Sequence, residues 1–399
     1  MEKIEGGGVL TAQGFRAGAA RCGMKQAEGE PDVALVVSDE PAAAAGVFTT
    51  NRFAAAPVRW CRRRLPTEQA RAVVVNAGNA NACTGEQGRR DVRATAELVG
   101  ELAGCAPEAV CIASTGIIGH PLPMDRLTDG VRAAWDNLTG QKSGADLAAR
   151  AIMTTDTRPK ACAVASETGG ISFRVGGMAK GAGMIAPHMA TMLCVITTDV
   201  AIPAELLRET VREVADCTFN RVTVDGDTST NDSALVLAGG ASGAAAAPGA
   251  GLGRFTEALE AVMADLSARI ARDGEGATKL LEVRVGGARS PADAERAARA
   301  VGESQLVKCA VYGGDPNWGR IVCALGYSGA QVEPEATSVR IGDVCVFEQG
   351  KPTGRNATEQ MAAERVVFEI DLGQGRATAT VLSCDLTEEY VRINAEYHT

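Results

Sequence analysis

Residues 176–196 read GGMAKGAGMIAPHMATMLCVI. Four glycines and a proline surround Lys180, and this composition is typical of a flexible loop. The last five residues, Met192–Ile196, are all apolar, which predicts a strand buried on both faces. Thr191 stands where the loop enters that strand. Catalytic groups commonly lie on loops held by a rigid scaffold, so the Thr191 hydroxyl is a candidate nucleophile.

The peptide bond before Thr191 is a candidate cleavage site, because the small residue Ala190 leaves the carbonyl open to attack. Cleavage would make Thr191 N-terminal, and its α-amine, with a reference pKa of about 7.7–8.0, can serve as the base for its own hydroxyl. Two other interpretations stay open. Lys180 among glycines can bind an anion, although Gly181 breaks the G-x-x-x-x-G-K-[ST] phosphate pattern. A threonine at the start of a strand is also ordinary β-propensity.

The composition predicts more than one domain, with cores of small aliphatic residues. The chain has 399 residues, of which 46 are glycine and only 4% are aromatic. Its formal net charge is −9, and its basic clusters, residues 62–64 and 89–90, are short. Nucleic acid is therefore not expected as a partner, and a solvated face is the simpler interpretation of both clusters.

The cysteines and histidines give no sign of a metal site. The 12 cysteines form no C-x-x-C pair, and the 3 histidines lack zinc-ligand spacing. The N-terminus has no apolar signal-like segment, and no apolar run approaches the length of a membrane span. We expect a soluble, cytoplasmic protein with reduced cysteines and no membrane partner.

Two further segments are candidates for a site. Ser114-Thr115-Gly116 follows a predicted strand and can present a hydroxyl together with backbone N–H groups, as an oxyanion hole requires. Glu275 lies between Gly274 and Gly276, which predicts an accessible backbone of the kind a binding site needs. A simple turn explains the first segment and a solvated acid after a helix explains the second, so both interpretations remain open. The polar loop 220–232 lacks the twelfth-position glutamate of a calcium-binding loop.

Strands and helices alternate along the chain, which predicts the α/β class. The expected strands are 33–37, 46–50, 72–75, 109–113, a hairpin at 161–175, 192–196, 280–285, 339–347, 366–372 and 377–382. The expected helices are 87–102, 124–138, 144–152, 203–216, 255–271 and 291–308.

Taken together, seven segments resemble the ornithine acetyltransferase family, also called glutamate N-acetyltransferase, which serves arginine biosynthesis. The resemblance runs in matching order from about residue 9 to the C-terminus, and the part from Met178 to Leu193 is close to diagnostic. The seven segments are 46–52, 76–85, 114–119, 180–193, 224–232, 313–320 and 394–399.

The resemblance implies layered sheets flanked by helices and a smaller C-terminal α/β domain at about 280–399. It implies self-cleavage between Ala190 and Thr191, which gives an α chain, 1–190, on the oxyanion-hole side and a β chain, 191–399, that carries the nucleophile. Two chains of each kind would form a heterotetramer.

The resemblance also implies a role for each site residue. Thr191 would be the nucleophile, with Thr115 and Gly116 as the oxyanion hole. The substrate-contacting positions would be Thr154, Lys180, Thr191, Glu275, Asn394 and Thr399. These types suit N-acetylornithine, because Lys180 can pair with its carboxylate and Glu275 with its side-chain amine.

The implied reaction moves the acetyl group from N-acetylornithine to glutamate through an acetyl ester on Thr191, with no metal or bound cofactor. Whether acetyl-CoA is a second donor stays open at this point. One alternative is a self-cleaving aminopeptidase or amidase, which would use water where the transferase uses glutamate. Another is a nucleotide- or phosphate-binding module built on residues 176–183, against which the missing Lys-[Ser/Thr] step argues.

Overall fold

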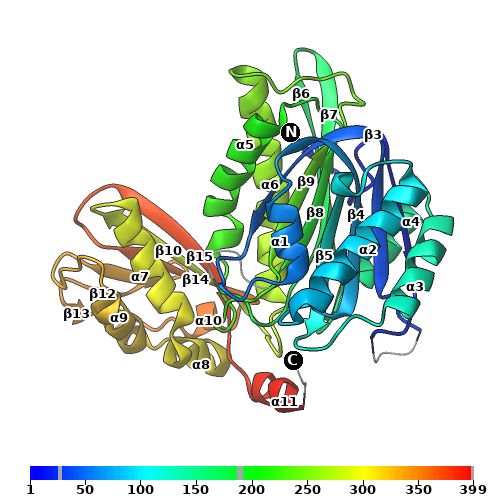
Figure 1. Ribbon diagram of the computed structural model, residues 1–399. Helices are drawn as coiled ribbons and strands as arrows, with labels where there is room; N and C mark the ends of the chain where they lie inside the picture. Colours follow the sequence, from blue (N-terminus) through cyan, green and yellow to red (C-terminus); the bar gives the residue numbers. More distant parts are fainter. Residues whose placement is uncertain (26–28, 187–191, 397–399) are drawn as a thin grey trace.

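The computed structural model describes residues 1–25, 29–186 and 192–396. They form a larger unit around a nine-stranded sheet and a smaller unit around a six-stranded sheet (Figure 1). Helices and strands alternate in both units, so the predicted α/β class is confirmed.

The larger sheet has the strand order β1-β6-β7-β8-β9-β3-β4-β5, and β2 pairs with β3 beside this path. Strand β3 joins two parts of the sheet, because its first half pairs with β2 and its second half with β9, while β4 lies beside it. The strands are β1 (Glu2–Lys3), β2 (Phe15–Ala20), β3 (Val33–Phe48), β4 (Thr67–Asn79), β5 (Val110–Ile117), β6 (Lys160–Thr168), β7 (Ile171–Lys180), β8 (Leu193–Thr198) and β9 (Ser233–Ala238).

Helices cover both faces of the larger sheet (Figure 1). The central strands contribute side chains to a hydrophobic core on each face. On β8, Leu193 and Val195 belong to the core shared with β2–β4, whereas Cys194 and Ile196 belong to the core under α5 and α6. This two-sided burial is what the apolar run at 192–196 predicted. The helices of this unit are α1 (Ala56–Arg62), α2 (Gly85–Ala103), α3 (Met124–Asp136), α4 (Lys142–Ala151), α5 (Ala204–Cys217) and α6 (Ala250–Arg272).

The smaller unit is a mixed sheet in the order β13-β12-β11-β14-β10-β15 with its own core. Leu280 and Cys384, at its inner edge, join the core under α6, so the two units are packed together. Its elements are β10 (Leu280–Ala288), α7 (Pro291–Glu303), α8 (Gln305–Gly313), α9 (Trp318–Tyr327), β11 (Ser338–Ile341), β12 (Val344–Glu348), β13 (Lys351–Pro352), α10 (Thr358–Met361), β14 (Arg365–Asp371) and β15 (Ala377–Cys384).

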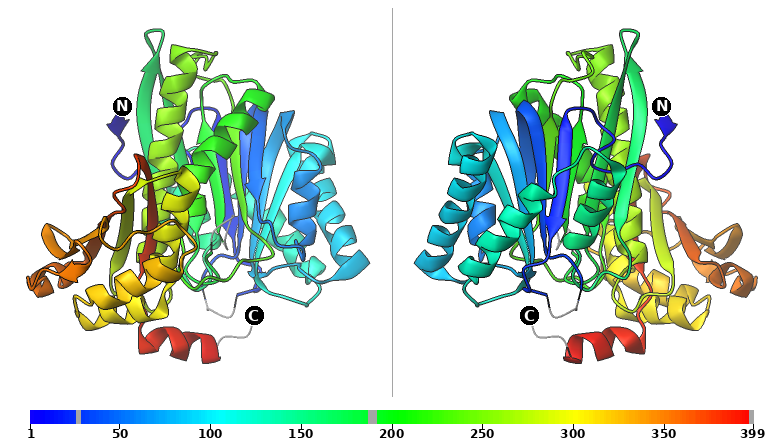
Figure 2. Two further views of the ribbon diagram at one scale, coloured as in Figure 1. Left: turned by 90° about the vertical axis from the view of Figure 1, so that its left-hand side faces the viewer. Right: turned by 90° about the vertical axis from the view of Figure 1, so that its right-hand side faces the viewer.

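The C-terminal helix α11 (Glu388–Glu396) leaves the smaller sheet and passes beneath the larger unit (Figure 2). None of its described residues is buried, so it is held by polar contacts and not by a core of its own. In the described part of the chain, no helix combines the length and the apolar character that crossing a membrane requires.

The prediction of a flexible loop from Gly176 was wrong for its first five residues. Gly176–Lys180 is the end of β7 and pairs with β6 on one side and β8 on the other. The two glycines are there for space: a Cβ on Gly176 would lie 2.2 Å from the Gly8 carbonyl oxygen, and one on Gly177 would lie 2.9 Å from Ile196. Composition alone does not distinguish a glycine that gives flexibility from one that allows close packing.

Three other boundaries differ from the prediction. The strands expected at 33–37 and 46–50 are one continuous strand, β3. The helix expected at 291–308 stops at Glu303, and Ser304 caps the new helix α8 by accepting a hydrogen bond from the Val307 N–H. The strand expected at 339–347 is a hairpin, β11–β12, that turns at Gly342 (φ +55°).

Candidate active site

Six of the predicted site residues line one pocket. They come from distant parts of the chain: β5, the loop after α4, the end of β7, the loop after α6, and α11. The six are Thr115, Gly116, Thr154, Lys180, Glu275 and Asn394. Ala190, Thr191 and Thr399 lie outside the described residues. Leu193, two residues after Thr191, pairs directly with Lys180 across β8 and β7, so the described chain resumes beside the pocket.

Thr115 and Gly116 lie within the end of β5 and not in a turn after it. Thr115 is 3% exposed, and Gly116 has φ +129°, a conformation that side chains rarely permit. A Cβ on Gly116 would also lie 2.3 Å from the carbonyl carbon of Gly78, because the β4–β5 register shifts at Gly78/Asn79. Irregular strand pairing of this kind recurs beside active sites, where it presents a backbone group that a regular ladder would use up.

A buried ionic cluster lies behind the pocket. The side chains of Lys160 and Asp156 are fully buried, and Lys160 Nζ lies 2.6 Å from Asp156 Oδ1 and 2.5 Å from Asp273 Oδ2. Asp273 also accepts hydrogen bonds from the hydroxyl and the N–H of Thr157. The cluster ties β6, the loop after α4 and the end of α6 to one another.

Lys180 extends this cluster into the pocket. Its Nζ donates to Thr154 Oγ1 at 2.6 Å and lies 3.8 Å from Asp156 Oδ2. Burial lowers the pKa of Lys180, and Asp156 opposes that shift. The carboxylates of Asp156 and Asp273 balance the two lysines in charge, but their short contacts are with Lys160, and the Lys180 ammonium lies 3.8 Å from Asp156 Oδ2. The Lys180 ammonium can therefore donate hydrogen bonds to a negatively charged ligand.

Asp156 remains a carboxylate although it is buried. Burial by itself would raise its pKa, but Lys180, Lys160 and the Gly181 N–H outweigh that effect and hold its pKa at about 2. The Gly181 N–H donates to Asp156 Oδ1 at 2.7 Å, and the Thr154 N–H donates to Oδ2 at 3.1 Å. Asp156 therefore fixes both ends of the Lys180–Thr154 contact.

Glu275 faces Lys180 across the pocket and is held by α11. Asn394 Nδ2 donates to Glu275 Oε2 at 2.8 Å, and the Glu275 N–H donates to the Ala182 carbonyl at 2.8 Å. A Cβ on Gly183 would lie 2.3 Å from the Glu275 carboxyl, so only glycine leaves room for this side chain. The pocket thus carries a cation on one side and a carboxylate on the other.

The glycines beside Glu275 have a different role from the one expected. A Cβ on Gly274 would lie 2.8 Å from Cys384 Sγ, and one on Gly276 would lie 2.6 Å from the Tyr390 nitrogen. They therefore allow β15 and α11 to approach closely, and they do not leave the backbone open to a ligand.

Sequence reasoning missed two acidic residues of the polar loop 220–232. Asp225 accepts hydrogen bonds from the N–H groups of Met184 (2.6 Å) and Ile185 (2.8 Å), and burial raises its pKa to about 6. Asp232 is fully buried and accepts the Met192 N–H at 2.9 Å. The two carboxyls hold the chain on either side of residues 187–191. The sequence did show a polar loop beside a predicted buried strand, but this pattern does not indicate which acidic side chains of the loop are buried.

Asn231 joins this loop to β5 and to the segment after β4. Its Nδ2 donates to the carbonyl oxygens of Ala80 (2.6 Å) and Ser114 (2.8 Å). The second oxygen of Asp232 has no hydrogen-bond partner among the described residues, and burial raises the pKa of Asp232 well above its usual range. The buried Asp232 carboxyl therefore lies at the N–H of Met192, the first described residue after Thr191.

Among residues 1–25, 29–186 and 192–396, no group of three or more His, Cys, Asp and Glu side chains is arranged to hold a metal ion. A larger cavity, of about 430 Å³ against about 70 Å³ here, lies between α1 and α2. We assign the chemistry to the smaller pocket, because it combines opposite charges, a hydroxyl and the Gly116 backbone near the start of β8.

A family model described as the ArgJ family matches residues 16–399. The protein named "Arginine biosynthesis bifunctional protein ArgJ" from Symbiobacterium thermophilum is 52% identical to this chain, with 98% of this chain and 99% of the relative covered. The protein of the same name from Thermosynechococcus vestitus is 46% identical, with 98% of both covered. A solved structure of ornithine acetyltransferase complexed with ornithine, from Mycobacterium tuberculosis, is 43% identical, covers 48% of this chain and 98% of that chain, and has a TM-score of 0.44.

The ionic cluster predicts a large cost for removing Asp156. Asp156→Asn should lower the free energy of unfolding at neutral pH by about 3–5 kcal/mol, because two buried lysines lose a shared carboxylate. Asp146→Asn is the matched control, since Asp146 pairs with Lys142 on an exposed face of α4, and it should cost at most about 1 kcal/mol. Denaturant unfolding of the three proteins measures both differences.

The same comparison has a defined pH dependence. The pKa of Asp156 is about 2 in the folded protein and about 3.9 in the unfolded chain. The ionised carboxylate therefore contributes fully to the free energy of unfolding above about pH 3.9, and this contribution is lost as the pH falls toward about 2. The difference between wild type and Asp156→Asn should therefore narrow as the pH falls below about 3.9. A neutral-pH difference no larger than that of Asp146→Asn would contradict this account.

Proposed function

The chain belongs to the ArgJ family, and we propose that it is a glutamate N-acetyltransferase that moves the acetyl group of N-acetylornithine to glutamate in arginine biosynthesis. The observation that carries this proposal is the meeting of Thr115, Gly116, Lys180 and Glu275 at one pocket, beside the strand that begins just after Thr191. The products are ornithine and N-acetylglutamate.

Charge selects the substrate. N-acetylornithine has a carboxylate near the acetylated nitrogen and a free amine at the end of its side chain. Lys180, whose ammonium lies 3.8 Å from Asp156 Oδ2, binds the carboxylate, and Thr154 fixes the position of the lysine. Glu275, held by Asn394, binds the amine. Lys180 can bind the α-carboxylate of glutamate in the same way when glutamate takes the place of ornithine.

The first half of the reaction forms an ester on the protein. The Thr191 hydroxyl attacks the acetyl carbonyl, and the Thr191 α-amine takes the hydroxyl proton. The Thr115 hydroxyl and the Gly116 N–H stabilise the oxyanion, at about 2.7–4 kcal/mol for each donor by analogy with other oxyanion holes. The C–N bond then breaks, and the ornithine nitrogen leaves with the proton that the α-amine held.

The second half reverses these steps with glutamate. The α-amine of glutamate attacks the ester, the same oxyanion hole stabilises the intermediate, and the Thr191 oxygen leaves and recovers its proton. One pocket can hold ornithine and glutamate in turn, because each brings a carboxylate to Lys180. N-acetylglutamate then leaves the restored enzyme.

Processing and assembly are further parts of the proposal. The Thr191 hydroxyl first attacks the Ala190 carbonyl, which breaks the peptide bond, frees the Thr191 α-amine and leaves an ester between Ala190 and the Thr191 oxygen. Water then hydrolyses this ester and divides the chain into 1–190 and 191–399, with residues from about 280 onward as a subdomain of the second chain. Two copies of each form a heterotetramer in the cytoplasm, and Thr399 completes the substrate pocket. The relatives' printed name, bifunctional, supports acetyl-CoA as a second donor of the acetyl group to glutamate.

Self-cleavage should be visible on a denaturing gel. Purified wild-type protein should give two fragments of similar size, with the second beginning at Thr191 by N-terminal sequencing, because the α-amine is free only after cleavage. Thr191→Ala should give a single full-length band. A wild-type chain that stays intact after long incubation at neutral pH would rule out the N-terminal threonine mechanism.

Glu275→Gln should lower kcat/KM for N-acetylornithine by at least about thirtyfold, because a buried carboxylate that binds a charged amine is lost. Self-cleavage should continue, since Glu275 acts on the substrate side chain. Glu389→Gln, on the exposed face of α11, is the matched control and should keep the wild-type value.

The assay follows N-acetylglutamate formed from N-acetylornithine. Omission of glutamate should stop turnover of the wild-type enzyme. Release of acetate at an unchanged rate without glutamate would assign the chain to the hydrolases and contradict the transferase function.

A further inference from the structure

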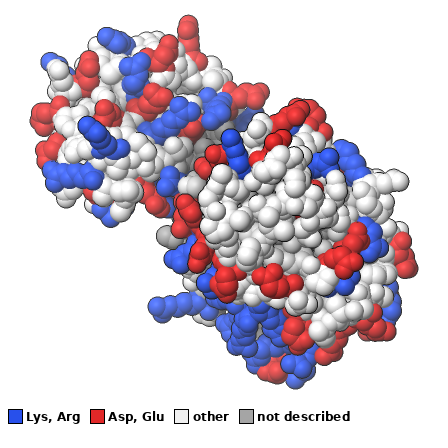
Figure 3. Space-filling model, turned by 90° about the horizontal axis from the view of Figure 1, so that it is seen from above, with Lys and Arg blue, Asp and Glu red and all other residues white. Residues whose placement is uncertain are grey.

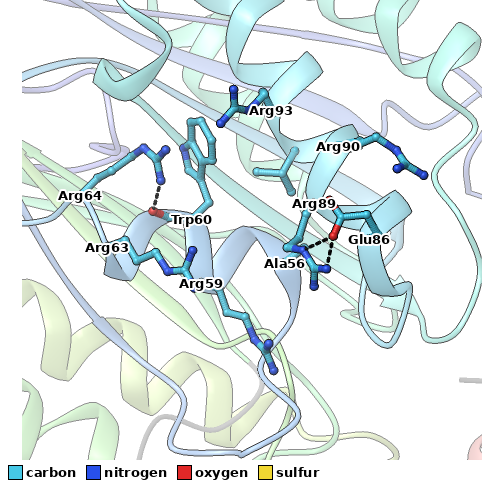
Figure 4. A pocket seen from close by; sticks show the side chains of 10 residues that line it. Ala56, Arg59, Trp60, Arg63, Arg64, Glu86, Arg89, Arg90 and Arg93 are labelled. Carbon is cyan, nitrogen blue, oxygen red and sulfur yellow. Dashed lines mark hydrogen bonds and ion pairs between the residues drawn. The ribbon is translucent and has the colours of Figure 1, made fainter.

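The two short basic clusters of the sequence come together in the fold. Helix α1 with the two residues after it, and helix α2, pack beside each other and turn arginines toward one groove (Figure 4). The six arginines are Arg59, Arg63, Arg64, Arg89, Arg90 and Arg93. The three on α2 follow helical spacing, so they share one side of that helix. The basic clusters are solvent-exposed, as expected, and in the fold they also line one groove.

The groove is strongly positive on a negatively charged protein. Among the residues that line it, one acid, Glu86, stands against the six arginines, whereas the whole chain has a formal net charge of −9. Figure 3 shows Lys and Arg gathered at its lower edge, the side that carries α1 and α2 in Figure 1. The cavity measures about 430 Å³, a volume typical of small-molecule sites.

The arginines lack enough acidic partners of their own. Within the described ranges, Arg89 is the only one of the six that forms an ion pair within 4.0 Å, and its partner is Glu86. Arg59 and Arg64 donate to the backbone oxygens of Ala54 and Trp60. The other five arginines thus line the groove without an ion pair of their own among the described residues, and an anion bound in the groove would supply one.

Arg64 is placed for binding by the residues around it. Its guanidinium carbon lies 3.3 Å from the centre of the Trp60 ring, and its Nε is buried with no hydrogen-bond partner among the described residues. Trp60 is itself fixed, because its Nε1 donates to the Val110 carbonyl at 2.9 Å. Burial lowers the pKa of Arg64; the Glu108 carboxylate opposes that shift, and Arg93 and Arg63 add to it. Arg64 is therefore held in place at the wall of the groove, where its remaining guanidinium donors can contact a ligand.

The groove continues into a second cavity with an exposed ring. This cavity, of about 340 Å³, shares Ala56, Arg59 and Arg89 with the first, and Phe53 lies on its wall with 71% of its surface exposed. An aromatic ring next to several guanidinium groups suits a ligand with phosphates at one end and a flat ring at the other.

We propose that the groove between α1 and α2 binds a phosphorylated nucleotide, with the arginines on its phosphates and Phe53 against its base. A chain of phosphates carries several negative charges and many acceptor oxygens, so it can contact several of these arginines at once, whereas a monocarboxylate carries a single charge and two oxygens. The site shares no lining residue with the acetyl-transfer pocket. The binding therefore does not depend on which reaction the pocket performs.

Isothermal titration of the full-length protein tests the proposal with ADP, coenzyme A, inorganic pyrophosphate and a single-stranded oligonucleotide. ADP or coenzyme A should bind more tightly than pyrophosphate. Arg63→Ala and Arg93→Ala should each weaken nucleotide binding about tenfold or more, because each removes charged hydrogen bonds. Phe53→Ser should weaken ADP binding and leave pyrophosphate binding unchanged. Arg254→Ala, an exposed arginine on α6, is the control and should bind like wild type.

Failure of the nucleotide site can be told apart from failure of the enzyme, because the variants should keep wild-type transfer from N-acetylornithine to glutamate and wild-type unfolding. No binding of ADP, coenzyme A or pyrophosphate at low salt would overturn the proposal. Arginine variants that bind like wild type would overturn it as well. If pyrophosphate binds as tightly as ADP, the base makes no contact with Phe53 and the proposed nucleotide site is wrong. If affinity for the oligonucleotide rises with its length, the groove is a nucleic-acid-binding surface instead.

Discussion

Lys160 lies fully buried between Asp156 and Asp273, and the pocket depends on this contact more than on any other. A buried ammonium cannot stay charged without partners, so the loop after α4 and the end of α6 must both close on β6. Asp156 then has one oxygen left for the Thr154 N–H and for the Lys180 ammonium. The ion pair between Lys160 and Asp156 thus also positions Lys180, the residue that we assign to binding the substrate carboxylate. The same geometry keeps the Lys180 ammonium 3.8 Å from Asp156, so the ammonium can still donate hydrogen bonds to a substrate carboxylate.

Space at three glycines is the second constraint on the pocket. Gly116 accepts a backbone conformation and an approach to Gly78 that no side chain would permit, and Gly183 leaves the volume that the Glu275 carboxyl fills. Gly276 lets the start of α11 come close enough for Asn394 to reach Glu275. Because α11 has no buried face, this hydrogen bond and the contacts near residues 387–390 place it. The smaller unit thereby contributes a residue to a pocket built mainly by the larger one.

The α/β class and most element positions followed from hydrophobic patterning, as at Met192–Ile196, whose apolar run is a strand with a core on each face. Hydrophobic patterning was less reliable at glycines, because a glycine can indicate either a flexible loop or close packing within a strand. Gly176 and Gly177 suggested a loop, but they are strand residues that make room for Gly8 and Ile196. The residues themselves indicated Thr191, the Thr115–Gly116 pair and Glu275 as candidates, whereas Thr154, Asn394 and Thr399 came only from the family resemblance. The cluster of Lys160, Asp156 and Asp273 was not foreseen, because the two carboxylates are more than 100 positions apart and meet only in the fold. The arginine groove was missed for the same reason, since each basic cluster is unremarkable until α1 and α2 pack.

The central claim is that one hydroxyl carries the acetyl group between two substrates that use the pocket in turn. Mass spectrometry of the enzyme after mixing with N-acetylornithine, in the absence of glutamate, tests it most directly. We expect one acetyl group on the fragment that begins at Thr191, located on that residue and lost when glutamate is added, with release of N-acetylglutamate. An enzyme that turns over normally with both substrates, yet never carries acetyl on that fragment, would contradict the account and require direct transfer between ornithine and glutamate bound together.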